Sequence, residues 1–330
     1  AREAREAERE SRVFDEIGLY VQEGRQVLAL LEDICFRDSP LRVLGRGTYG
    51  KVVQARKRGT GQLYALKIMR KEDVLTRNQV RHTLTERHVL QSVRHPFVIG
   101  LQFAFQTADK LYLVLPFMAG GELFFHLRRE RTFSEARVLL YASEILLALQ
   151  ELHRHDIVYR DLKPENVMVG EFGEVYVMDW GLARIMGRED FHGEALSPAK
   201  QDESVVSDRL DQRDVTPGST MFTMEGDVMG TPSYMPPEQA RGEIEEMDHR
   251  SDVYAVGAML YHLLSGRRPY HQEGEQVNVF TTLLRLIDGP PTPLHELNKE
   301  TPPELEAICE KAMCRDSSGR YADMRECILL

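Results

Sequence analysis

The sequence predicts an α+β chain with two lobes, a small one built on an antiparallel sheet and a larger, mostly helical one. Between Leu41 and Phe117, short apolar runs alternate with glycine-containing turns, a pattern typical of strands. Beyond the segment MAGGE, apolar residues recur at helical spacing instead. We therefore expect a charged helical extension over 1–38, the small lobe over 39–117 and the large lobe over 118–330.

The extension begins with AREAREAERE, in which strong helix formers carry opposite charges three and four residues apart. No sustained apolar heptad follows, so an exposed helical linker is favoured over an oligomerising coiled coil. The chain starts with Ala1 and stops within the helix-like RYADMRECILL. We therefore expect it to be part of a longer protein, truncated at its C-terminus.

Composition narrows the classes of function. The formal net charge is −10, which argues against nucleic acid as a partner, and 4 cysteines in 330 residues do not form a disulfide framework. No run of about 18 apolar residues is present in the sequence to cross a membrane. A cytoplasmic protein is expected, unless regions outside this sequence anchor it, and its oligomeric state is left open.

The elements of the two lobes follow from local patterns. In the small lobe the expected strands are LRVLGRG, KVVQARKR, LYALKIMR, LQFAFQT and KLYLVLPF, with one main helix over about Glu72–Val93. In the large lobe the clearest helix spans Ser134–His153. Its predicted inward face is formed by Ala142, Ile145, Leu149 and Leu152.

Three glycines lie between the first two strands, in GRGTYGKV. Without a Cβ, Gly45, Gly47 and Gly50 allow backbone amides to approach an anion, and the strands around them would form a flap over phosphates. The pattern alone is equally typical of an ordinary hairpin with a glycine turn.

The next strand places a small residue and a cation on one face. In YALK, period-two alternation puts Ala65 and Lys67 on the same side of the strand. Lys67 lies in the apolar run LYALKIM, which argues against a solvated lysine. Its candidate acidic partner is Glu86 in TERHVL.

The segment IVYRDLKPENVMV, residues 157–169, concentrates polar side chains on one loop. Asp161 is suited to accept a proton from an attacking hydroxyl, Lys163 to neutralise a transferring phosphate, and Asn166 to bind a divalent cation. Asp179, after the strand-like VYVM, supplies a second metal ligand. With the glycine flap and the strand lysine, these residues form a phosphoryl-transfer site.

The order of these motifs resembles that of the eukaryotic-type protein kinases, from about residue 39 to the end of the chain. The resemblance implies ATP and Mg²⁺ as cofactors, with Mn²⁺ as an alternative metal. It also implies that Lys67 binds the α- and β-phosphates, that Glu86 holds Lys67, and that Asp161 is the catalytic base. The implied metal ligands are Asn166 and Asp179.

The same resemblance implies an adenine site with Leu115 as gatekeeper and Pro116–Met118 as hinge. The residues that it assigns to nucleotide contact are Gly45, Gly47, Gly50, Val52, Ala65, Lys67, Leu115, Phe117, Met118, Glu122 and Met168.

Two parts of the resemblance differ. Residues 41–169 are similar to the AGC branch, with Tyr159 where most kinases have histidine. From VMDWGLAR onward, the sequence is more similar to bacterial eukaryotic-like kinases. Thr231 resembles the threonine of serine/threonine rather than tyrosine kinases, so serine and threonine hydroxyls of proteins are the expected acceptors.

The departures from the family pattern are compatible with activity. In the metal motif the second residue is Trp180, an aromatic that we expect in the core. In the motif PPE, Glu238 keeps the acid that the family pairs with an arginine, here Arg320. Asp252 resembles the helix aspartate that braces the catalytic loop.

A long activation segment is expected over 179–238, and its polar, acid-rich composition predicts disorder over its first part. Arg160 would receive an activation-loop phosphate, and Glu225 and Asp227 would supply part of that charge permanently. The candidate autophosphorylation sites are Thr220 and Thr223.

The sequence constrains the preference for substrate residues less than it constrains the reaction. Glu122 and Glu165 match AGC positions that contact arginines upstream of the target hydroxyl, so a basic substrate is favoured. The alternative is a ribose contact for Glu122 and a solvated side chain for Glu165.

An ATP-dependent serine/threonine protein kinase is therefore the favoured function. A pseudokinase scaffold or nucleotide-binding module is the alternative, and a small-molecule phosphotransferase of similar fold is a third class.

Overall fold

The structure is a computed structural model that describes residues 42–328, except 48–49, 77–79, 188–230, 273 and 275–277. The predicted N-terminal extension lies outside the described residues, as does most of the predicted activation segment with Thr220, Thr223, Glu225 and Asp227.

The chain forms two compact units. Of the described residues, the first unit holds 42–94 and 99–118, and the second holds 95–98 and 119–328. The short piece His95–Val98 belongs to the second unit because the Phe97 carbonyl accepts the Val177 amide at 2.9 Å and Val98 bridges Val177. None of the helices in the described part of the chain is both long and apolar enough to span a lipid bilayer.

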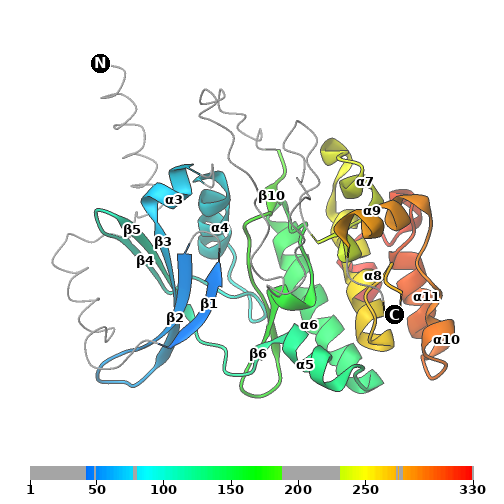
Figure 1. The fold of residues 1–330 in the computed structure, drawn as a ribbon, viewed down its shortest axis with the longest axis horizontal. Helices are drawn as coiled ribbons and strands as arrows, with labels where there is room; N and C mark the ends of the chain where they lie inside the picture. Colours follow the sequence, from blue (N-terminus) through cyan, green and yellow to red (C-terminus); the bar gives the residue numbers. More distant parts are fainter. Residues whose placement is uncertain are drawn as a thin grey trace. The chain divides into compact units, whose positions relative to one another are not determined.

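The first unit is built on an antiparallel sheet of 5 strands in the order β1-β2-β3-β5-β4 (Figure 1). The strands are β1 (Val43–Gly47), β2 (Gly50–Arg56), β3 (Leu63–Arg70), β4 (Phe103–Gln106) and β5 (Lys110–Pro116). The helices are α3 (Lys71–Thr76) and α4 (Val80–Ser92). The predicted helical segment Glu72–Val93 is thus helical in its described parts up to Ser92, while residues 77–79 between α3 and α4 lie outside the described residues.

Alternation along β3 separates a buried face from a partly exposed one. Leu66 and Ile68 are buried, whereas Ala65 and Lys67, which alternate with them, are only partly buried. The predicted period of two is thus confirmed. The core cluster on the buried face consists of Val53, Ala55, Tyr64, Leu66, Ile68, Phe105 and Val114.

Gly50 is required by packing inside the sheet. A Cβ at this position would lie 1.9 Å from the backbone oxygen of Ile68 on β3, whereas a Cβ at Gly45 would meet nothing within 4 Å. We expect Gly50→Ala to lower the free energy of unfolding by about 2 kcal/mol, because the clash is with backbone. Gly45→Ala is the matched control. Urea unfolding of both variants checks this, and equal stability would contradict it.

The second unit combines many helices with two small sheets, β6-β8-β9 and β10-β7. Its strands are β6 (Gly121–Glu122), β7 (Ile157–Val158), β8 (Val167–Val169), β9 (Val175–Val177) and β10 (Arg184–Ile185). Its α-helices are α5 (Leu123–Glu130), α6 (Glu135–Arg154), α7 (Pro237–Ala240), α8 (His249–Ser265), α9 (Val279–Asp288), α10 (Leu294–Leu297), α11 (Pro303–Ala312) and α12 (Met324–Ile328). Its 3-10 helices are η1 (Pro164–Asn166), η2 (Pro232–Tyr234), η3 (Ile244–Glu246) and η4 (Ser317–Gly319).

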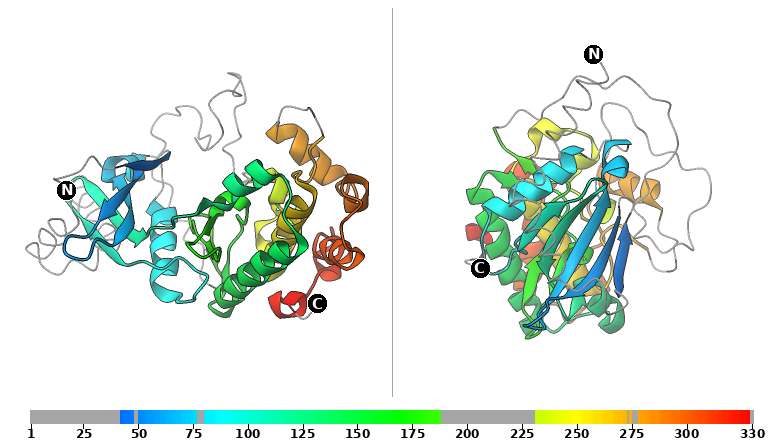
Figure 2. Two further views of the ribbon diagram at one scale, coloured as in Figure 1. Left: turned by 90° about the horizontal axis from the view of Figure 1, so that it is seen from below. Right: turned by 90° about the vertical axis from the view of Figure 1, so that its left-hand side faces the viewer.

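Helix α8 is the centre of this unit. It is buried on all sides from Ser251 to Leu264, as its nearly continuous apolar sequence requires. Helices α6 and α11 pack on it, and the C-terminal helix α12 packs on α6 (Figure 2).

Helix α6 begins after Ser134, as predicted, and ends at Arg154. Ile145, Leu149 and Leu152 are buried, but Ala142 is only partly buried, so that part of the prediction was wrong. The larger side chains of Val138 and Tyr141 fill the inward face, and Ala142 lies at its border.

Candidate active site

In the first unit, Lys67 and Glu86 form the predicted ion pair. The Lys67 Nζ lies 2.7 Å from both carboxylate oxygens of Glu86, which comes from α4. The lysine side chain is 29% exposed and the glutamate side chain 9%. A nearly buried carboxylate thus fixes a cation on the side of the sheet that faces away from the core cluster.

Other predicted nucleotide contacts surround Lys67 on the sheet. Val52 is the register partner of Lys67, and Leu115 is the register partner of Ala65. All are partly exposed. Phe117 and Met118 follow β5 directly. The sheet therefore brings together a small apolar surface and a fixed cation, and their contact with a nucleotide stays a prediction.

In the second unit, a further pair of predicted contacts is adjacent. Glu122 of β6 is the register partner of Met168 of β8. Both side chains are partly exposed.

Asp161 is the centre of the hydrogen-bonded loop that the sequence singled out. Its Oδ2 accepts hydrogen bonds from the Lys163 Nζ at 2.6 Å and from the Asn166 Nδ2 at 2.9 Å. The Asn166 Nδ2 also donates to the Asp161 backbone oxygen, at 2.9 Å. These contacts bring three of the predicted catalytic and metal-binding residues together and hold the Asp161 carboxylate in one orientation.

Lys163 connects this loop to the segment that follows the undescribed residues 188–230. Its Nζ donates to the Thr231 Oγ1 at 3.0 Å. The ammonium group therefore lies between a carboxylate and a hydroxyl, with a side chain that is 17% exposed.

Asp179 is positioned by the hairpin of β8 and β9. The Met178 amide donates to the Asn166 carbonyl at 2.9 Å. This hydrogen bond fixes the backbone just before Asp179 next to the loop that contains Asp161. Its φ of 69° is in the left-handed region. Burial raises the pKa of Asp161, the charge of Asp179 adds to the rise, and Lys163 and Asn166 oppose it. The two aspartates are therefore electrostatically coupled.

The oxygens available here fit a divalent cation. The Asn166 amide nitrogen is turned toward Asp161, which directs the amide oxygen away from it. Amide and carboxylate oxygens are the ligands that Mg²⁺ prefers. Asn166 and Asp179 are thus suited in chemical type to hold a metal ion.

Asp252 braces the catalytic loop, as predicted. Its carboxylate is fully buried and accepts the backbone amides of Tyr159 and Arg160, each at 2.8 Å, and the His153 Nε2 at 2.8 Å. The φ of Arg160 is 66°, a conformation that costs a non-glycine residue energy. The three hydrogen bonds that the buried Asp252 carboxylate accepts offset the energetic cost of this backbone conformation.

Trp180 belongs to the core, as predicted. It is 1% exposed and meets the Tyr159 ring edge-on at 5.2 Å, while the Tyr159 hydroxyl donates to the Met178 carbonyl at 2.5 Å. The aromatic pair thus supports the backbone just before Asp179.

Trp180→Phe is expected to lower the free energy of unfolding by about 1–2 kcal/mol, because a smaller ring leaves a cavity. Activity is expected to survive within about threefold, since the backbone contact of Tyr159 is kept. Urea unfolding and phosphate transfer would be measured on the same protein. A well-folded variant without transfer would contradict this.

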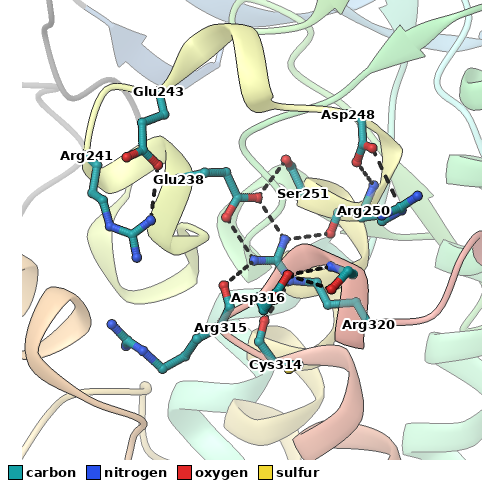
Figure 3. Close-up of polar contacts among 11 residues, drawn as sticks. Glu238, Arg241, Glu243, Asp248, Arg250, Ser251, Cys314, Arg315, Asp316 and Arg320 are labelled. Carbon is teal, nitrogen blue, oxygen red and sulfur yellow. Dashed lines mark hydrogen bonds and ion pairs between the residues drawn. The ribbon is translucent and has the colours of Figure 1, made fainter.

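Glu238 and Arg320 form the predicted buried pair (Figure 3). The Arg320 Nη1 and Nη2 donate to the two carboxylate oxygens of Glu238 at 2.7 and 2.8 Å, and the Ser251 hydroxyl donates to the same carboxylate at 2.9 Å. The pair links α7, α8 and the segment after η4. It is a scaffold element of the second unit.

Glu165 has a partner that the sequence did not indicate. Its Oε1 lies 3.0 Å from the Arg268 Nη2, and the two side chains are only 16% and 20% exposed. The alternative of a solvated Glu165 was therefore wrong. No local pattern joins residues 103 positions apart.

One unit holds a strand lysine paired with a helix glutamate, and the other holds a loop in which an aspartate accepts hydrogen bonds from a lysine and an asparagine. These are elements of a protein kinase. The protein kinase domain family matches residues 39–328. The chain belongs to this family, to its eukaryotic-type serine/threonine kinases.

Individual relatives agree with this assignment. The chain is 37% identical to protein kinase 2 of Dictyostelium discoideum over 85% of this chain and 50% of that protein. It is 35% identical to human RAC-beta serine/threonine-protein kinase over 87% of this chain and 52% of that protein. It is 41% identical to mouse serine/threonine-protein kinase Sgk3 over 70% of this chain and 40% of that protein.

The chain thus spans about half the length of the curated relatives that it matches. These relatives are AGC-type kinases, which confirms the resemblance stated for the first half of the sequence. The bacterial resemblance of the second half stays a prediction. Use of ATP with a divalent metal ion is typical of this family.

Proposed function

We propose that this protein is an active serine/threonine protein kinase, which transfers the γ-phosphate of ATP to hydroxyl groups of protein substrates. The observation that supports it best is the arrangement around Asp161. A carboxylate held by Lys163 and Asn166, with Lys163 also bonded to Thr231, provides a base and a cation at one point.

Each residue then has a distinct task. Asp161 accepts the proton of the attacking hydroxyl, and Lys163 balances charge on the phosphoryl group in transfer. Lys67, held by Glu86, binds the α- and β-phosphates. Mg²⁺, or Mn²⁺ in its place, would be bound by Asn166 and Asp179 and would neutralise phosphate charge. Adenine contacts are assigned to the sheet residues around Ala65 and to Met168.

The residue that selects the acceptor is Thr231. Its hydroxyl contacts Lys163 beside the base, so a serine or threonine hydroxyl is the acceptor that we propose. The two acids Glu122 and Glu165 were assigned to basic side chains upstream of it. Glu122 keeps this assignment here, together with the alternative of a ribose contact.

The test is transfer of labelled γ-phosphate to matched peptides that carry serine, threonine or tyrosine, with Mg²⁺, with Mn²⁺ and with EDTA. We expect transfer to serine and threonine, loss of transfer in EDTA, and little transfer to tyrosine. ATP binding is measured in parallel by calorimetry. A folded protein that binds ATP but transfers to none of the peptides would favour the pseudokinase scaffold instead.

A further inference from the structure

Arg268 and Glu165 form an ion pair directly beside the base loop. Glu165 is the middle residue of η1. The next residue, Asn166, donates to Asp161, and Lys163, two positions before Glu165, donates to Thr231. A peptide whose hydroxyl reaches Asp161 therefore places its adjacent residues within reach of the Glu165 side chain. An unpaired carboxylate at this point would attract a basic substrate residue.

The carboxylate is already occupied by a cation of the same chain. The Arg268 Nη2 lies 3.0 Å from the Glu165 Oε1, and both side chains are mostly buried. Charge-assisted hydrogen bonds are stronger than neutral ones, and partly buried ion pairs are screened less than exposed pairs. The second oxygen, Oε2, is buried without a hydrogen-bond partner among the described residues. Because this oxygen is shielded from solvent, it is not open to a substrate side chain, and the contact with Arg268 uses the other one.

Arg268 is held in place from other elements of the second unit. Its guanidinium lies 5.2 Å from the centre of the Phe124 ring on α5. Burial and the charge of Glu165 raise the pKa of Tyr234, while the charge and hydrogen bond of Arg268 oppose the rise, so Tyr234 of η2 faces both partners. The Tyr234 hydroxyl lies 2.6 Å from the His262 Nδ1.

His262 does not compete with Arg268 for the acid. Burial, together with the positive charges of Arg268 and His271, lowers the pKa of His262 to about 3. The imidazole is therefore neutral near pH 7. Arg268 is the cation that balances Glu165.

We infer that Arg268 is an internal occupant of the acidic subsite that Glu165 would otherwise offer to a substrate, so that this protein selects a neutral side chain there. The inference rests on the proposed kinase function and refines its substrate class. An incoming arginine would have to displace Arg268, which would leave a mostly buried guanidinium without its carboxylate. Such displacement costs more than the new contact returns.

The test measures peptide binding by fluorescence anisotropy, using labelled peptides with alanine at the acceptor position. Arginine is placed in turn at each position upstream of the acceptor and compared with glutamine. For wild type we expect Kd ratios near 1 at the position that faces Glu165. For Arg268→Gln we expect arginine at that position to bind about tenfold more tightly. The double variant Glu165→Gln with Arg268→Gln is expected to lose this gain.

Two controls separate specificity from structure. Arg268→Lys keeps the charge and is expected to keep the wild-type ratio. Arg154→Gln removes the same charge from an exposed pair on α6 and is expected to change no ratio. Thermal unfolding is recorded for every variant. If Arg268→Gln does not fold, the inference is tested with Glu165→Gln alone. Because Arg268 already neutralises Glu165 in the wild type, this variant should leave the Kd ratios of arginine to glutamine peptides unchanged.

Either of two results overturns the inference. One is an Arg268→Gln variant that is folded and gains no preference for arginine at any position. The other is a wild-type preference for arginine that Glu165→Gln abolishes. Because binding is measured without transfer, these results are distinct from a failure of the kinase proposal, which would appear as absent transfer to serine and threonine peptides.

Discussion

Asp161→Asn is expected to lower kcat for phosphate transfer by about a thousandfold, within the range that a positioned general base contributes. The amide keeps the shape of the side chain but cannot accept the proton. Steady-state kinetics with a serine peptide would give kcat. ATP affinity, measured by calorimetry, is expected to stay within about twofold, because the Asp161 carboxylate accepts hydrogen bonds from Lys163 and Asn166.

Asp156→Asn is the matched control for this variant. Asp156 is exposed, lies just before the same loop and has a φ of 56°, a conformation that asparagine also tolerates. Wild-type activity is expected for it. Equal activity of Asp161→Asn and wild type would remove Asp161 from the role of base.

The acid side of the pH profile tests the same residue independently. Burial raises the pKa of Asp161 from the ordinary value of 3.8, with the charge of Asp179 adding to the rise. A base must be deprotonated, so kcat/KM should fall as the pH drops through this raised pKa. The fall should therefore begin at a higher pH than for an ordinary aspartate. If the residual activity of Asp161→Asn falls at the same low pH as that of wild type, the fall is caused by the titration of another group.

Local patterns were sufficient to predict the strands and to place Asp161, Lys163 and Asn166 close together on one loop. Period-two alternation in LYALKIMR correctly separated Leu66 from Lys67, because strand alternation depends only on neighbouring residues. The pairing of Lys67 with Glu86 followed from an isolated cation that needed an acid nearby in sequence. The catalytic loop is one continuous segment, so its members were adjacent before folding.

Contacts between segments that are far apart in the sequence were harder to predict. The pair of Glu165 and Arg268 joins an η1 turn to the residues after α8, and Arg268 in SGRRPY resembles any surface arginine in sequence. The tight packing of Gly50 against Ile68 depends on the register of β2 and β3, which a glycine pattern does not reveal. The pairing of Glu238 with Arg320 was predicted only through the family resemblance.

The largest effect on stability is expected for Arg320→Met. The side chain of Arg320 is fully buried, and all its N–H groups donate, to Glu238 and to the backbone oxygens of Cys314, Arg250 and Arg315. Removing it leaves the Glu238 carboxylate buried with Ser251 as its remaining side-chain donor among the described residues. We expect a loss of about 3–5 kcal/mol in the free energy of unfolding, measured with urea.

Two further variants identify the cause. Arg241→Gln breaks an exposed pair with Glu243 in the same region and should cost about 0.5 kcal/mol or less (Figure 3). Glu238→Gln combined with Arg320→Met should be more stable than Arg320→Met alone, because the unpaired buried charge is gone. Equal losses for the single and the double variant would attribute the effect to packing.

The pH dependence of stability gives a further test of the pair formed by Glu238 and Arg320. Burial alone would raise the pKa of Glu238, but the hydrogen bonds and charge of Arg320 outweigh it, so the pKa is lowered from the ordinary 4.5. A lowered pKa in the folded state means that ionised Glu238 stabilises the fold above the ordinary value, and that this contribution is lost as the pH falls through the folded pKa. The stability difference between wild type and the double variant should therefore narrow in acid. A difference that stays constant from neutral pH to below 4.5 would show that the pair contributes no ionic stabilisation.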